Sequence, residues 1–219
     1  MSMYCTFQVS YYTWSMNTEP VTWLEKNFSG YMVNTPLSDE LADEIDQVQR
    51  AFHAEFPSGI YYMPRQSLHV TLYDWIAPLY AYAGKDKEAL YSSIHDSYHA
   101  ATLGAVATTP PFTVHFRSVV VSPTTIYIRG YDNGEFNTMR ETFVDNVELI
   151  DDTKRPPTII HSSIARFTRA LPLPALEAFA QTLDLSHYED INGFRLVHST
   201  REPMLEFDEV HHYPLRDAA

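Results

Sequence analysis

Two short stretches of the sequence, about half a chain length apart, repeat one pattern of alternating apolar and reactive side chains. The first is Ser-Leu-His-Val-Thr-Leu over residues 67–72, and the second is Ile-His-Ser-Ser-Ile over residues 160–164. Successive side chains of a β-strand point to opposite faces, so each stretch would place its histidine and its hydroxyl on one face. These residues are His69 with Thr71, and His161 with Ser163. The apolar residues on the opposite face would anchor each strand to a core.

Two imidazoles on a shared cleft could carry out acid–base catalysis at phosphorus without a metal ion. A neutral imidazole takes a proton from the attacking water or hydroxyl group, and a protonated imidazole gives a proton to the departing oxygen. Histidine suits both roles because its unperturbed pKa is about 6.5. The hydroxyls of Thr71 and Ser163 would hold the non-bridging phosphate oxygens, where negative charge grows. We therefore predict His69 and His161 as a catalytic pair and expect neither a metal ion nor a cofactor.

Extending each strand by its period of two predicts further residues of the cleft. Tyr73 continues the face of His69, and Phe167 continues the face of His161, so either ring could stack on a nucleotide base. Arg166 falls on the opposite face of an ideal strand and would reach a phosphate only through a bulge or a twist. We predict Tyr73, Phe167 and Arg166 as substrate-binding residues.

The elements around the two motifs have the same order in both halves of the chain: strand, helix, histidine-bearing strand, helix. Apolar residues at helical spacing follow a helix start at Thr35-Pro36 and continue to Phe52. Further helices are predicted around residues 90–101, 136–147 and from Pro174, with strand pairs over 112–121 and 126–131 and over 194–198 and 204–210. This order is a rough twofold repetition, and it predicts an α+β fold class with two sheets facing each other and helices outside. The predicted domains are an aromatic N-terminal extension over residues 1–30 and one bilobal domain over 31–215, with the lobes meeting near 104–111.

The paired motifs resemble those of the 2H phosphoesterase superfamily, which includes 2′-5′ RNA ligase-like proteins and 2′,3′-cyclic nucleotide phosphodiesterases. The resemblance covers roughly residues 31–215 and includes the Ile-Ala-Arg sequence that follows the second motif. It implies a bilobal α+β fold, with two lobes related by an approximate twofold axis and mainly antiparallel sheets that form a central groove. The two motifs would line this groove without a metal, with His69 and His161 as the catalytic pair and Thr71 and Ser163 as phosphate binders. Ser162 stands where the family usually has an apolar residue, and we expect weaker packing there.

Composition restricts the partners of the protein. The chain has 219 residues and a formal net charge of −13, which disfavours a long polynucleotide, because such binding depends on lysine and arginine neutralising phosphates. We expect a small nucleotide or short oligonucleotide as substrate, and a monomer. The single Cys5 excludes an internal disulfide, and the absence of a long apolar run or a signal pattern predicts a cytoplasmic protein without a membrane segment. His95 and His99 have metal-ligand spacing on a predicted helix, but no partner in the sequence completes a site.

The predicted function is hydrolysis of a small nucleotide phosphodiester, either a 2′,3′-cyclic phosphate or a 2′-5′ or 3′-5′ linkage in a short or cyclic oligonucleotide. The sequence leaves open which histidine is the acid and which the base. Three alternatives also stay open: the reverse reaction, which forms a 2′-5′ bond in RNA; a catalytically silent nucleotide-binding module; and a protein-interaction domain that uses residues 1–30.

Overall fold

The computed structural model describes residues 16–151 and 155–216. Cys5 and the first half of the predicted N-terminal extension lie outside these ranges. The first part of the chain contains β1 (Asn27–Pro36), α1 (Asp39–Glu55), β2 (Ile60–Tyr62), β3 (His69–Ile76) and α2 (Lys87–Ala107), with short 3₁₀ helices at Arg65–Ser67 and Tyr82–Gly84. The second part contains β4 (Phe112–Val121), β5 (Thr125–Tyr131), α3 (Glu135–Asp145), β6 (Ile160–Phe167), α4 (Leu173–Ala180), β7 (His187–Ile191), β8 (Gly193–Arg201) and β9 (Glu206–Pro214).

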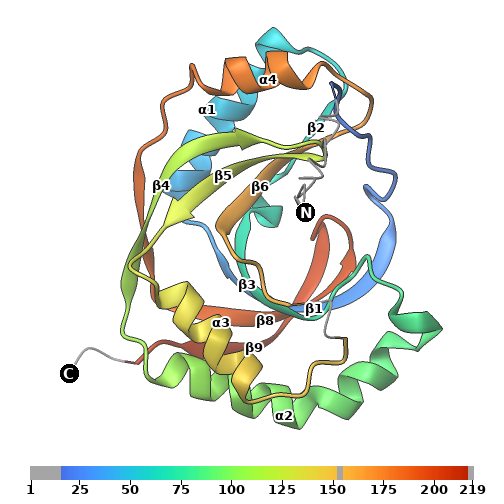
Figure 1. Ribbon diagram of the computed structural model, residues 1–219, viewed down its shortest axis with the longest axis vertical. Helices are drawn as coiled ribbons and strands as arrows, with labels where there is room; N and C mark the ends of the chain where they lie inside the picture. Colours follow the sequence, from blue (N-terminus) through green and yellow to red (C-terminus); the bar gives the residue numbers. More distant parts are fainter. Residues whose placement is uncertain (1–15, 152–154, 217–219) are drawn as a thin grey trace, which may run out of the picture.

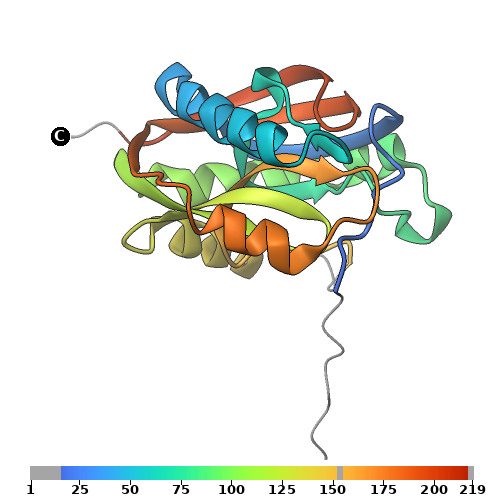
Figure 2. The same ribbon diagram turned by 90° about the horizontal axis from the view of Figure 1, so that it is seen from above.

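The strands form two antiparallel sheets that meet at the motif strands. One sheet has the order β3-β1-β8-β9 and the other β2-β6-β5-β4-β7, and β3 contacts β6 where the sheets adjoin (Figure 1). Helices α1 and α4 pack on the five-stranded sheet, and α2 and α3 pack on the four-stranded sheet. Figure 2 shows the same arrangement from above, with the strands between the helices. The predicted α+β fold with two antiparallel sheets and helices outside is confirmed.

The two sheets do not follow the two halves of the chain. Strand β2 precedes the first motif yet pairs with β6, and β8 and β9 return from the end of the chain to pair beside β1. Helices also cross over, because α1 contacts β6 and α3 contacts β3. The chain therefore crosses between the two sheets several times, and the predicted meeting of the lobes near residues 104–111 is only one of these crossings. The order of elements along a sequence does not specify which sheet edge each strand joins.

Several predicted boundaries shift because strand pairing extends further than the local pattern indicates. Strand β1 begins at Asn27, so the predicted end of the extension at residue 30 falls inside it. The same strand continues to Pro36, which pairs with His69, and α1 consequently begins at Asp39 rather than at Thr35-Pro36. Its N-cap is Ser38, whose hydroxyl accepts a hydrogen bond from the backbone N–H of Leu41 at 3.2 Å. The short strands β2 and β7 were not predicted, since neither has the length or alternation to mark it.

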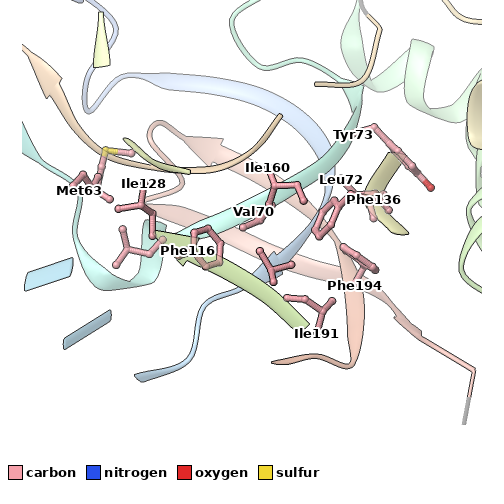
Figure 3. Close-up of a cluster of buried hydrophobic side chains, with 14 of the residues drawn as sticks. Met63, Val70, Leu72, Tyr73, Phe116, Ile128, Phe136, Ile160, Ile191 and Phe194 are labelled. Atoms are coloured by element: carbon pink, nitrogen blue, oxygen red, sulfur yellow. The ribbon is translucent and has the colours of Figure 1, made fainter. Parts of the chain in front are cut away.

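The apolar residues of both motifs are buried, as predicted. Val70 and Leu72 from β3 lie in the core together with Ile160 from β6. Figure 3 shows them packed near Phe116 and Ile128, which belong to the other strands of the five-stranded sheet. This burial holds each motif strand by one face and leaves its histidine and hydroxyl on the other.

Ser162 is a polar residue within this apolar pattern, and its substitution tests how the buried hydroxyl affects stability. The residue is 1% exposed and its Oγ has no hydrogen-bond partner in the described structure. A buried unpaired hydroxyl is destabilising, so we expect Ser162→Ala to raise the free energy of unfolding by about 1 kcal/mol. Urea unfolding of the variant beside the wild-type protein measures this difference. A decrease in stability would show that the hydroxyl has a partner that compensates for its burial.

None of the helices in residues 16–151 and 155–216 is long and apolar enough to cross a membrane.

Candidate active site

A β-bulge in β3 follows the first motif directly. Thr71 and Tyr73 pair with adjacent residues of β1, so Leu72 is an extra residue on this strand. The alternation shifts at this point, and Leu72 and Tyr73 are both buried. Tyr73 is 1% exposed and stacks on Phe143 with ring centroids 3.9 Å apart. The prediction that Tyr73 lines the groove is therefore wrong, and Asp74 takes the groove position instead.

Strand β6 carries the equivalent bulge after the second motif. Ser163 and Ala165 pair with adjacent residues of β5, which makes Ile164 the extra residue. Phe167 consequently turns into the core and is completely buried, so the prediction that it lines the groove is also wrong. Arg166 lines the groove. An ideal strand would place it on the opposite face, and the bulge brings it to the groove, as the prediction required. Asp74 and Arg166 each lie five residues after a motif histidine.

Polar side chains from two helices hold the bulges. Arg140 of α3 donates from Nε to the carbonyl of Leu72 at 2.9 Å and from Nη2 to that of Thr71 at 2.8 Å. Gln49 of α1 donates from Nε2 to the carbonyl of Ile164 at 2.9 Å. Each bulge thus receives its hydrogen bonds from a helix that belongs to the other half of the sequence.

The two motifs meet in a groove of about 260 Å³. The residues predicted for catalysis or substrate binding that line it are His69, Thr71, His161, Ser163 and Arg166. The wall also contains Trp23, Asp74 and Glu202, which the sequence reasoning did not identify. Asp74 could have been predicted as a groove residue, because it lies five residues after His69 just as Arg166 lies five residues after His161. Nothing in the local sequence indicates that Trp23 and Glu202 line the groove.

Trp23 belongs to the segment that the sequence predicts as a separate extension. Backbone hydrogen bonds tie this segment to the domain, from Thr18 N to Leu171 O and from Val21 N to Phe167 O, both at 2.8 Å. The ring of Trp23 lies 5.3 Å from the guanidinium carbon of Arg166. Residues 16–26 therefore contribute a wall of the groove.

Each of the two histidines forms a hydrogen bond with a backbone carbonyl. The Nδ1 atom of His69 lies 2.8 Å from the carbonyl oxygen of Ser67. A carbonyl only accepts, so Nδ1 carries a hydrogen and Nε2 is left to exchange protons with a ligand. His161 also forms a hydrogen bond with the backbone carbonyl of Ile159, which again lies two residues earlier in the chain.

The surroundings of the groove lower the pKa of both histidines. Burial lowers the pKa of His69 to about 4, and the positive charges of Arg195 and Arg166 act in the same direction. Burial also lowers the pKa of His161 from 6.5, with Arg166 and Arg140 adding to the effect. Both imidazoles are therefore mainly neutral at pH 7 in the unliganded protein.

Arg166 has the contacts expected of an anion-binding residue. Its Nη2 donates to Oγ of Ser163 at 3.1 Å, which leaves the serine hydrogen available to a ligand. Its Nε is buried and has no hydrogen-bond partner in the described residues. Because buried donors are normally paired, an unpaired guanidinium N–H at a groove favours an anionic ligand such as a phosphate.

Carboxylates limit the positive charge of the groove. Glu202 is 6% exposed and accepts a hydrogen bond from Oγ of Ser199 at 2.8 Å. Burial raises the pKa of Glu202, while Arg166 and Lys87 oppose this rise. With Glu202 on one wall and the exposed Asp74 on another, the groove suits a ligand with few negative charges.

The pair of histidines with metal-ligand spacing has other contacts. The rings of His95 and His99 stack with centroids 5.7 Å apart, and Nδ1 of His99 lies 2.9 Å from the hydroxyl of Tyr213. Across the part of the chain that the structure describes, no group of three or more histidine, cysteine or acidic residues is arranged to hold a metal ion.

Comparisons with known proteins relate this fold to solved structures. No family model and no curated protein matches the sequence. The protein TT0787 of Thermus thermophilus superposes with a TM-score of 0.62 at 16% identity, over 87% of this chain and 100% of its own. E. coli LigT complexed with ATP superposes with a TM-score of 0.53 at 13% identity, over 86% of this chain and 99% of its own. A structure described as a phosphoesterase has a TM-score of 0.52 at 13% identity, with the same coverage of both chains. The chain shares the fold of these proteins, as its resemblance to the 2H phosphoesterases implied.

Proposed function

We propose that this chain is a metal-independent phosphodiesterase of the 2H type that hydrolyses a small nucleotide phosphodiester. The observation that carries the proposal is the meeting of both histidines, both hydroxyls and Arg166 in one groove. The structures that share its fold include a phosphoesterase and LigT complexed with ATP or with 3′-AMP, which supports a nucleotide as the ligand. The candidate bonds are a 2′,3′-cyclic phosphate and a 2′-5′ or 3′-5′ linkage in a short or cyclic oligonucleotide.

The low pKa of His69 supports the role of general base for this residue. Nε2 of His69 takes a proton from water as the water oxygen attacks phosphorus. The bond to the leaving oxygen breaks on the opposite side, and that oxygen takes a proton from Nε2 of His161. The hydroxyls of Thr71 and Ser163 and the guanidinium of Arg166 hold the non-bridging oxygens, where donors fixed in advance stabilise the developing charge.

This assignment predicts an acidic optimum for kcat/KM. The base is active above its pKa, so activity rises as His69 loses its proton at about pH 4. The acid is active below its pKa, so activity falls as His161 loses its proton below pH 6.5. We expect a bell-shaped profile of kcat/KM with its maximum between these values, because kcat/KM reports the free enzyme. A maximum above pH 7 would contradict the assignment.

Hydrolysis of a small substrate panel in EDTA tests the proposed function. The panel contains 2′,3′-cyclic mononucleotides, 2′-5′ and 3′-5′ dinucleotides and cyclic oligonucleotides. Turnover of at least one member in EDTA supports the proposal and identifies the bond that is cleaved. Loss of turnover on adding EDTA would overturn metal independence. Nucleotide binding without any turnover would indicate the silent binding module instead.

A further inference from the structure

We propose that the open face of the five-stranded sheet binds additional nucleotides of a short single-stranded oligonucleotide, extending the catalytic groove. The inference rests on the proposed function and specifies its substrate as an oligonucleotide. The surface, here termed the aromatic–arginine face, consists of Tyr127, Arg129, Tyr131, Arg117, His115 and Tyr188.

The aromatic–arginine face begins beside the catalytic residues. Arg129 pairs directly with His161, and Tyr127 pairs with Ser163. Directly paired residues of antiparallel strands lie on the same face of a sheet. The Tyr127 ring also approaches the imidazole of His161 edge-on, with centroids 5.4 Å apart. Strand β5 thus continues the surface that carries the motif on β6, and β6, β5 and β4 lie side by side (Figure 1).

The surface continues without interruption to the strand next to β4. Tyr131 pairs with His115, which pairs in turn with Tyr188 of β7. The rings of His115 and Tyr188 stack with centroids 4.2 Å apart and planes 9° apart. Arg117 lies at an irregularity in the pairing of β4, and its guanidinium carbon is 4.3 Å from the Tyr131 centroid. Arg129 approaches the same ring at 5.3 Å.

The arginines of this face are not neutralised by neighbouring acids. Across residues 16–151 and 155–216, neither Arg117 nor Arg129 forms a salt bridge with a carboxylate. The neighbouring Asp132 instead accepts hydrogen bonds from backbone N–H groups of Gly134 and Phe136. On a chain with a net charge of −13, two such arginines beside partly exposed rings form a local surface complementary to an anionic ligand.

Exposure and size favour an oligonucleotide as the occupant. Helices α1 and α4 pack on the sheet that carries this face, yet Tyr188 is 68% exposed. Three strand spacings separate β6 from β7, which makes about 14 Å. One nucleotide adds a rise of about 3.4 Å along one strand of a duplex, so the face is long enough for more than one nucleotide. Aromatic rings that stack on bases, interleaved with cations that meet phosphates, are the usual means of binding single strands. The acidic remainder of the chain restricts this binding to short strands.

Two substrates with the same scissile bond test the proposal. One is uridine 2′,3′-cyclic phosphate, and the other is a hexauridylate that ends in a 2′,3′-cyclic phosphate. The variants are Arg117→Gln, Tyr188→Ala and the double substitution, with Tyr188→Phe and Arg50→Gln as matched controls, since Arg50 is exposed on α1. If the panel identifies another bond, the same pair of lengths is built around that bond.

We expect kcat/KM of the double variant for the mononucleotide to stay within about twofold of the wild-type value. Its kcat/KM for the hexamer should fall by about tenfold or more, which is the scale of one lost stacking contact. The loss should appear in KM, and Arg117→Gln should reduce the salt dependence of hexamer binding by about 0.7 in log–log slope. Tyr188→Phe keeps the ring and should behave as wild type. Equal effects on both substrates, or none on the hexamer, would overturn the proposal.

Failure of the proposed function gives a different result. If neither substrate is hydrolysed, binding of a fluorescein-labelled hexauridylate is measured by fluorescence anisotropy in wild type and the double variant. Weaker binding by the double variant alone then supports the aromatic–arginine face while rejecting catalysis. Unchanged binding, or no binding by the wild-type protein, rejects the face as well.

Discussion

Replacing His69 or His161 with alanine should lower kcat by about 10²- to 10⁴-fold, the usual effect of removing a general acid or base. Each imidazole lines the groove with one ring nitrogen hydrogen-bonded to a backbone carbonyl. Alanine leaves no group to exchange the proton at that position. The measurement is single-turnover hydrolysis in EDTA, with the bond identified by the substrate panel. His53→Ala, on the exposed surface of α1, is the matched control and should retain wild-type activity.

The pH profiles of these variants separate the two roles. If His69 is the base, His69→Ala should lose the rising limb of kcat/KM on the acidic side. If His161 is the acid, His161→Ala should lose the falling limb at higher pH. An exchange of these outcomes would reverse the roles without removing the two-histidine mechanism. Activity that survives both substitutions would mean that other groups carry the proton transfers.

Replacing Arg166 with alanine should lower kcat/KM by about 10²- to 10³-fold, comparable to removing one preorganised donor at a developing anion. The substitution removes a half-buried positive charge, the unpaired Nε and the hydrogen bond to Ser163. It also separates Trp23 from its cationic neighbour. Steady-state kinetics on the cleaved substrate, at the optimal pH of each variant, gives the effect.

Arg166→Lys distinguishes charge from geometry. Lysine keeps the positive charge but has no planar fork to donate to Ser163 and to a phosphate together, so only partial recovery is expected. Arg169→Gln is the matched control, because Arg169 follows β6 on the exposed surface and bonds to Ser58. Wild-type kcat/KM in Arg166→Ala would show that the arginine does not contact the phosphate. Full activity in Arg166→Lys would show that charge alone suffices.

The placement of each histidine beside its hydroxyl was predictable from the sequence because it depends on local geometry alone. A period of two places His69 with Thr71 and His161 with Ser163 on one face, and it buries Val70 and the other apolar neighbours on the opposite face. The same pattern appeared twice, and its resemblance to the 2H phosphoesterases predicted that both copies line one groove. The α+β fold class and the antiparallel pairing followed from the order of elements.

Beyond each hydroxyl the local period fails, because a bulge depends on the partner strand and on hydrogen bonds from distant helices. Arg140 and Gln49 hold the two bulges from helices of the opposite halves of the chain. These contacts decide that Asp74 and Arg166 line the groove, while Tyr73 and Phe167 enter the core. Long-range packing likewise decides that Trp23 forms a wall of the groove and that burial lowers the pKa of His69. Such contacts join residues remote in sequence, and therefore only the tertiary structure determines them.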